Sequence, residues 1–233
     1  GRFPVRVWLI SFLGWTFDFY DLMLISFLLI PIGRDLRLTV PEEALILGVA
    51  LGASGIGGIL FGYLSDRYGR KQVMTWTIGL YSLGTALCAL SVGPWSLLVF
   101  RLVTGLGVGG EWAVGASLLS ETWPKRWRPW LAAVLQSGVN VGILCASGIY
   151  FLLVLAGLPH RSVFLVGVLP ALLVLWIRKA VPESVEWQAA RREVSKGEHI
   201  QQPIPGIADL FRGEIRRTTI LTILVCSFSL SAH

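Results

Sequence analysis

Four ionisable residues stand inside stretches that are otherwise apolar, and they are the residues of this sequence best able to move a charge. Asp18 and Asp21 share one such stretch, and Arg101 and Glu111 share another. An ionised side chain at the centre of a lipid bilayer costs about 2.5–3.5 kcal/mol on insertion scales, so such residues usually face a partner or an aqueous cavity. We therefore expect proton-linked chemistry from Asp18, Asp21, Arg101 and Glu111.

Asp21 and Arg101 are predicted to meet. Counted from the outer ends of their helices, Asp21 lies about 7 Å deeper than Arg101, a gap that a long arginine side chain bridges. Arginine keeps its charge at any accessible pH, whereas a carboxylate gains or loses a proton according to its surroundings. Protonation of Asp21, with Asp18 three residues away on the same face, would release Arg101 to bind an anion. The alternative is that the pair only neutralises charge and joins two helices, and for Glu111 proton binding and helix packing are equally open.

Polar side chains near these charges are candidates for lining a substrate path. Gln136 and Asn140 are four residues apart, so they share one face of a further apolar stretch. Tyr20 precedes Asp21, and Trp112 follows Glu111. We expect these four side chains to line the path, with hydrogen bonding between helices as the alternative for Gln136 and Asn140.

Composition places these residues in a membrane. The 233 residues are 54% hydrophobic and 15% charged, against roughly a quarter charged in soluble domains. Crossing the hydrocarbon core takes about 20 apolar residues as a helix, and six stretches meet that need: Val7–Ile30, Ala44–Leu64, Gln72–Leu90, Trp95–Leu119, Leu131–Gly157 and Ser162–Ile177. A seventh run, Thr218–His233, covers about 24 Å, so we expect the chain to end inside it.

The predicted fold class is therefore an all-α membrane protein. Residues 1–178 form a bundle of six transmembrane helices, residues 179–217 form a connecting loop, and residues 218–233 form a truncated seventh helix.

The basic residues predict the orientation. Sixteen of the 20 lysines and arginines lie on the side that holds the N-terminus and the 179–217 loop, and three lie on the other side. Loops rich in Lys and Arg stay in the cytoplasm. We expect a multi-pass protein of the plasma (inner) membrane with a cytoplasmic N-terminus. The net charge of +6 then reports topology, and no nucleic-acid partner is expected.

A glycine-rich run lies between Arg101 and Glu111. Its G-x-G core is shared with dinucleotide-binding loops, but no strand precedes it and it lies inside an apolar span. Close helix packing is the preferred interpretation for the glycines of this run and of the second span: Gly105, Gly107, Gly109, Gly110, Gly48, Gly52, Gly55, Gly58 and Gly62. The sequence has no P-loop, no H-E-x-x-H, no G-x-S-x-G and no Cys/His cluster, so we expect no cofactor, no metal site and no enzymatic activity.

The loop after the second span reads Gly62-Tyr-Leu-Ser-Asp66-Arg67-Tyr-Gly69-Arg70-Lys71. The two glycines would allow tight helix ends, and Asp66 would accept hydrogen bonds from a helix N-terminus. This stretch closely resembles the cytoplasmic signature of the major facilitator superfamily. The resemblance implies a gating contact with a partner half of a transporter, made by Gly62, Asp66, Arg67, Gly69, Arg70 and Lys71.

Three further stretches narrow the resemblance within that superfamily. The run from Arg101 to Trp112 is similar to the fourth-span motif of proton-coupled members, and Ser120-Glu-Thr-Trp-Pro-Lys-Arg126 is similar to the following loop of metabolite:proton symporters. Val181-Pro-Glu-Ser184 resembles the end of span six in sugar porters and organic-acid symporters, but Val185-Glu186 replaces the Pro-Arg of a sugar porter. The sialate/lactate and aromatic-acid symporter branches are the most similar.

The resemblance implies a twelve-helix transporter of two six-helix bundles, of which this chain is the N-terminal one. Its partners would be the lipid bilayer, the missing C-terminal half, a proton and a small carboxylate. The expected function is proton-coupled symport of a small organic acid by alternating access. The alternatives are a facilitator or proton symporter of sugars or polyols, and a membrane sensor that moves no substrate.

Overall fold

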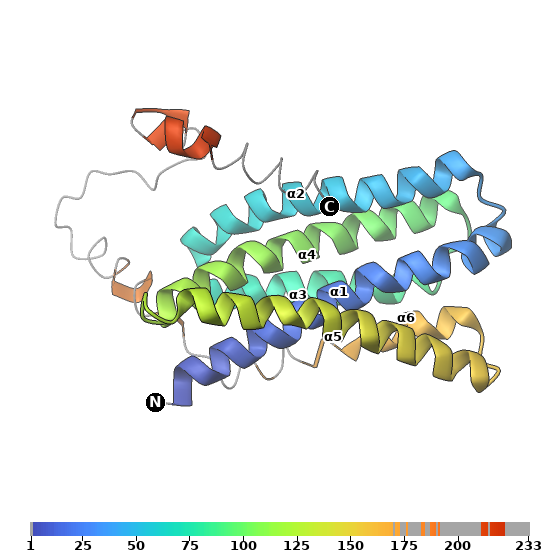
Figure 1. Ribbon diagram of the computed structural model, residues 1–233. Coiled ribbons are helices and arrows are strands. Elements are labelled where there is room, and N and C mark those ends of the chain that lie inside the picture. Colours follow the sequence, from blue (N-terminus) through green and yellow to red (C-terminus); the bar gives the residue numbers. More distant parts are fainter. Residues whose placement is uncertain are drawn as a thin grey trace. The chain divides into compact units, whose positions relative to one another are not determined.

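The computed structural model describes residues 2–169, 171–172, 176, 183–184, 187–189, 191, 211–213 and 215–221. Over these residues the elements are α1 (Arg2–Leu36), α2 (Val40–Tyr68), α3 (Arg70–Cys88), α4 (Pro94–Thr122), α5 (Arg128–Leu155), the 3-10 helix η1 (His160–Ser162) and α6 (Val163–Val166). Figure 1 shows α1 to α5 as long helices. The all-α fold class is confirmed.

Among the described residues, four helices are long and apolar enough to cross a membrane. They are 28 or 29 residues long: Trp8–Leu36, Val40–Tyr68, Pro94–Glu121 and Arg128–Leu155. The helix α3 has 19 residues, begins with the polar run Arg70-Lys71-Gln72 and is not among these four. Its Thr77, Ser82 and Thr85 are buried. Within the predicted sixth span the described residues 162–169, 171–172 and 176 include α6, whereas most of the predicted seventh span lies outside the described residues.

The helix α4 is the central element of the bundle. It packs against α2, α3 and α1, while α5 packs against α1. Glycine makes the α2–α4 contact close, because a Cβ atom on Gly57, Gly105 or Gly109 would collide with a backbone carbonyl of the facing helix. The predicted close packing is confirmed at Gly105 and Gly109, and Gly57 was not among the predicted glycines; at all three positions the facing carbonyl leaves no room for a side chain.

The same prediction is wrong for three glycines of α2. A Cβ atom on Gly48, Gly52 or Gly55 would meet nothing within 4 Å. The three residues are spaced by four and three positions, so they share one helix face, and that face is exposed. Gly62 makes only an ordinary contact, since its Cβ would lie 3.7 Å from that of Ala113.

The chain divides into two compact units, Gly1–Trp187 and Gln188–His233. The first unit extends past residue 178 because the segment after α6 returns to the loop between α2 and α3. The backbone N–H of Lys71 donates to Oε1 of Glu183 at 3.1 Å, and Nε1 of Trp187 donates to the carbonyl of Asp66 at 2.8 Å. In the second unit the described residues include a helical stretch at 215–221.

Candidate functional site

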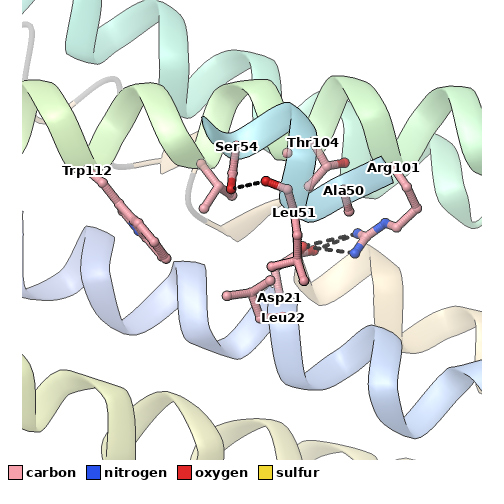
Figure 2. A pocket seen from close by; sticks show the side chains of 10 residues that line it. Asp21, Leu22, Ala50, Leu51, Ser54, Arg101, Thr104 and Trp112 are labelled. Carbon is pink, nitrogen blue, oxygen red and sulfur yellow. Dashed lines mark hydrogen bonds and ion pairs between the residues drawn. The ribbon is translucent and has the colours of Figure 1, made fainter. Parts of the chain in front are cut away.

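A buried ion pair joins α1 to α4. Nη2 of Arg101 lies 3.0 Å from Oδ1 and 3.1 Å from Oδ2 of Asp21, and Nη1 lies 3.1 Å from Oδ2. Figure 2 shows the two side chains pointing toward one another. Thr85 of α3 adds a hydrogen bond from a third helix, because its hydroxyl donates to Oδ1 of Asp21 at 2.6 Å. The predicted contact between Asp21 and Arg101 is confirmed, and both side chains are almost fully enclosed.

A small cavity of about 60 Å³ adjoins this pair, lined by residues of α1, α2 and α4. Figure 2 shows the pair toward one end of the lining and Trp112 at the other. Asp21 and Arg101 supply its charges, and Leu22, Leu51 and Val108 are among its apolar walls. An anion that entered here would meet a guanidinium in surroundings of low dielectric, where a charge-assisted hydrogen bond is strong.

Trp112 connects the cavity to the second acid of α1. Its indole Nε1 donates to Oδ2 of Asp18 at 2.7 Å, and Asp18 is fully buried. The ring is held in place by Phe19, stacked at 5.7 Å between centroids, and by Trp15, tilted at 5.3 Å. The aromatic residues near Asp18 therefore fix the direction of one hydrogen bond to its carboxylate.

Glu111 is buried next to Gly14 of α1. The carboxylate occupies the place that a Cβ atom on residue 14 would need. Neither of its oxygens has a hydrogen-bond partner among the described residues, and the same holds for the hydroxyl of Tyr81 and for Oδ1 of Asp18. The four ionisable residues expected inside spans are thus all buried, but only Asp21 and Arg101 neutralise each other.

The expected path residues have different surroundings. Tyr20 is buried with its hydroxyl directed at the carbonyl of Val163, 3.5 Å away, and it does not line the cavity beside Asp21. Gln136 and Asn140 lie on the exposed face of α5. Trp112 is the one of the four that lines this cavity. A role of these residues in a substrate path stays a prediction.

The signature loop forms a second ionic cluster, made by Asp66, Arg70 and Glu121, which we call the motif cluster. Nη2 of Arg70 lies 3.0 Å from Oε1 of Glu121, and Nη1 bonds to Oδ1 of Asp66. Burial alone would lower the pKa of Arg70, but the hydrogen bonds and charges of Glu121 and Asp66 outweigh burial and raise this pKa above its ordinary value. The cluster joins the end of α2, the start of α3 and the end of α4.

Two expectations for this loop need correction. Asp66 binds the side chain of Arg70, and it is Glu183 that accepts the hydrogen bond at the start of α3, from the N–H of Lys71. Gly62 lies inside α2, six residues before its end. The need for glycine holds at Gly69, where φ is 106° and a Cβ atom would press on the carboxylate of Glu183. Arg67 stacks over the ring of Tyr68 at 5.9 Å.

Sequence reasoning missed Tyr81 and Thr85 of α3. Both are buried, and Thr85 bonds to Asp21 directly. A signal was present, because Thr77, Tyr81 and Thr85 recur every four residues and so mark one polar stripe on a helix. It was hidden by the apolar residues between them.

This geometry defines a class of protein: a helical membrane protein that holds an acid–base pair inside its bundle, next to a cavity. The chain belongs to the Major Facilitator Superfamily, whose family model matches residues 8–232. It is an integral membrane protein.

Relatives and solved structures agree with this assignment. The chain is 43% identical to the sialic acid transporter NanX of Escherichia coli (strain K12) over 184 residues, 76% of this chain and 44% of that protein. It is 34% identical to the niacin transporter NiaP of Acinetobacter baylyi over 207 residues, 88% of this chain and 46% of that protein. The chain thus spans less than half the length of these two relatives. The proton:xylose symporter XylE, solved with 6-bromo-6-deoxy-D-glucose bound, shares the fold with a TM-score of 0.73 at 20% identity, over 99% of this chain and 54% of that chain.

Proposed function

We propose that this chain is the first half of a twelve-helix transporter that moves a small organic acid together with protons by alternating access. The observation that carries the proposal is the buried Asp21–Arg101 pair beside a cavity between α1, α2 and α4. A permanent cation facing a titratable acid, both shielded from water, is the minimum needed to link anion binding to protonation.

The linkage follows from competition for one guanidinium. When Asp21 is ionised, its two oxygens occupy both terminal nitrogens of Arg101. A proton added to Asp21 cancels the negative charge, and the N–H groups of Arg101 then turn to the carboxylate of the substrate. When the proton leaves, Asp21 competes with the substrate again and favours its release. The proton and the substrate therefore bind in the same state of the transporter.

Three further points support the proposal. Sialic acid and niacin, for which the two relatives are named, are both carboxylic acids. The lysines and arginines favour a cytoplasmic N-terminus in the inner membrane. Gln136 and Asn140, on the exposed face of α5, would line the path against the second half, and the motif cluster with Arg67 and Lys71 would gate it from the cytoplasmic side.

The test is uptake by the complete transporter in sealed vesicles with a panel of labelled carboxylates and neutral sugars. We expect accumulation of a carboxylate in response to an inward proton gradient, and loss of that accumulation when an ionophore collapses the gradient. Accumulation that is unchanged when the proton gradient is collapsed would exclude proton symport. Uptake of sugars alone would favour the polyol alternative, and ligand binding without flux would identify a sensor.

A further inference from the structure

Three buried side chains, each with a polar atom that has no hydrogen-bond partner among the described residues, lie near one another. The unpartnered atoms are Oδ1 of Asp18, the hydroxyl of Tyr81 and both carboxylate oxygens of Glu111. The three side chains are at most 3% exposed, and Tyr81 lies within electrostatic range of Asp18, Asp21 and Glu111. Buried polar atoms are nearly always satisfied in native proteins. Three unsatisfied groups within electrostatic range of one another therefore mark a place for protons or a water molecule.

The buried charges do not balance, and this also indicates that a proton is bound here. Three acids and one base are buried among the described residues: Asp18, Asp21, Glu111 and Arg101. Arg101 is engaged by Asp21 through three nitrogen–oxygen contacts. Asp18 and Glu111 therefore have no cation of their own, and an ionised carboxylate buried without one is costly. A proton on at least one of the two acids removes that cost.

We infer that Asp18 and Glu111 form a second proton-binding site, which takes the proton from Asp21 and passes it toward the motif cluster. This inference rests on the proposed proton symport. Asp18 lies three residues before Asp21, about 4.5 Å along α1. Glu111 lies ten residues after Arg101 on the antiparallel α4, about 15 Å along that helix. Both displacements point to the end of the bundle where Arg70 binds Glu121.

Each transfer breaks one O–H bond and forms another. Asp21 gives its proton to Oδ1 of Asp18, which is left open because Trp112 holds Oδ2. Asp21 becomes anionic and pairs with Arg101 again, the arrangement present in the structure. Asp18 then gives the proton to Glu111, and Glu111 gives it to water.

Room for a carrier exists on this route. A cavity of about 10 Å³ is lined by Glu111 and Trp112, with Ser11 and Trp15, and about 10–15 Å³ is enough for one water molecule. The hydroxyl of Tyr81 both donates and accepts, so it serves either transfer. The titratable groups within electrostatic range of the site are Asp21 from α1 and Tyr81 from α3, and α5 adds the apolar Leu135. Arg101 of α4 is paired with Asp21.

Infrared difference spectra of the complete transporter, recorded between acid and alkaline pH in light and heavy water, test the site directly. A protonated carboxyl has a carbonyl stretch that an ionised one lacks. We expect such a band in the wild type and in Asp21→Asn, and its loss or displacement in Asp18→Asn and in Glu111→Gln. The matched control is Ser82→Ala, which removes another buried hydroxyl without a partner and leaves the band in place. A band unchanged in both acid variants overturns the inference and leaves the symport proposal standing.

Transport measurements test the passage of the proton. Glu111→Gln should lower proton-driven accumulation about a hundredfold or more, the range for loss of a positioned acid or base, while exchange of internal for external substrate continues. A merely structural role would reduce both activities together, and that result overturns the inference. Accumulation by the wild type that does not depend on a proton gradient would overturn the symport proposal and the passage of the proton that rests on it. The infrared bands would still show whether Asp18 and Glu111 hold a proton.

Discussion

Two arginines of this bundle bind carboxylates at the same distance in different surroundings. Arg101 lies 3.0 Å from Asp21, with side chains 1% and 4% exposed, and Arg70 lies 3.0 Å from Glu121, with side chains 12% and 15% exposed. The second partner of Arg70, Asp66, is 51% exposed. The nitrogen–oxygen distance is therefore the same in the Arg101–Asp21 and Arg70–Glu121 pairs, and what differs is the exposure of the side chains to water.

That difference fits the switch proposed for Asp21 and Arg101 and a structural role for the motif cluster. In a dry site the loss of one partner leaves an uncompensated buried charge, which costs about 3–5 kcal/mol. At a partly exposed site water replaces part of the lost interaction, so the cost is smaller, and it falls to about 0–1 kcal/mol for a fully exposed pair. The free-energy change on neutralising Asp21 is therefore large enough for the rearrangement that we propose. The free energy needed to separate the helix ends joined by the motif cluster is smaller.

The largest effect is expected from Asp21→Asn. The amide cannot neutralise Arg101, so we expect a loss of stability of about 3–5 kcal/mol, seen as a lower thermal midpoint of the detergent-solubilised protein. Because the variant cannot be protonated at this position, accumulation driven by a proton gradient should also disappear, while exchange of substrate continues. Unchanged stability and unchanged accumulation would show that Asp21 and Arg101 do not depend on each other.

A double variant separates the loss of stability from the loss of transport. Asp21→Leu together with Arg101→Met replaces the whole pair by apolar groups, which is often neutral or stabilising. We expect the thermal midpoint to return toward that of the wild type, with transport still absent. A double variant as unstable as Asp21→Asn would indicate that the charges are needed for folding itself.

Gly105→Ala perturbs the buried pair without touching a charge. The added methyl group would collide with the carbonyl of Ala50, so α4 must shift one turn below Arg101. Overpacking of this kind costs about 1–3 kcal/mol, and the motif cluster should be unaffected. Gly52→Ala is the matched control on α2, since its methyl group meets open space. Equal effects of the two substitutions would mean that the α2–α4 contact is not what positions Arg101.

The sequence predicted the parts of this arrangement that depend on depth and hydropathy. Apolar runs predict where helices cross, and counting residues from their ends was enough to pair Asp21 with Arg101. The rotation of a helix about its axis is not set by such counts, so Thr85 and Tyr81 were missed and Gly52 was placed on the wrong face. Contacts between distant segments are equally hidden, as with Glu183, which bonds to a residue 112 positions earlier.

A smaller effect is expected at the motif cluster from Arg70→Gln. This substitution removes the charge that holds Glu121 and Asp66, and hydrogen bonds to charged groups contribute about 1.5–3 kcal/mol. We expect a loss at the lower end of that range, because the cluster is partly exposed. Glu121→Gln should reproduce most of it, since that carboxylate makes two of the bonds to Arg70. A loss as large as that of Asp21→Asn would contradict the contrast between dry and wet pairs.

The smallest effect is expected from Asp66→Asn, and salt makes it diagnostic. Asp66 is exposed and four residues before Arg70 on the chain, and such pairs contribute about 0.3–0.5 kcal/mol. Because the screening length falls from about 10 Å at 0.1 M to about 3 Å at 1 M ionic strength, the difference from wild type should shrink as salt is raised to 1 M. The Asp21→Asn difference should persist in the same titration, since the side chains of Arg101 and Asp21 are only 1% and 4% exposed. If both differences fell together, the buried pair would have to be open to water, and the dry site on which its role as a switch depends would not exist.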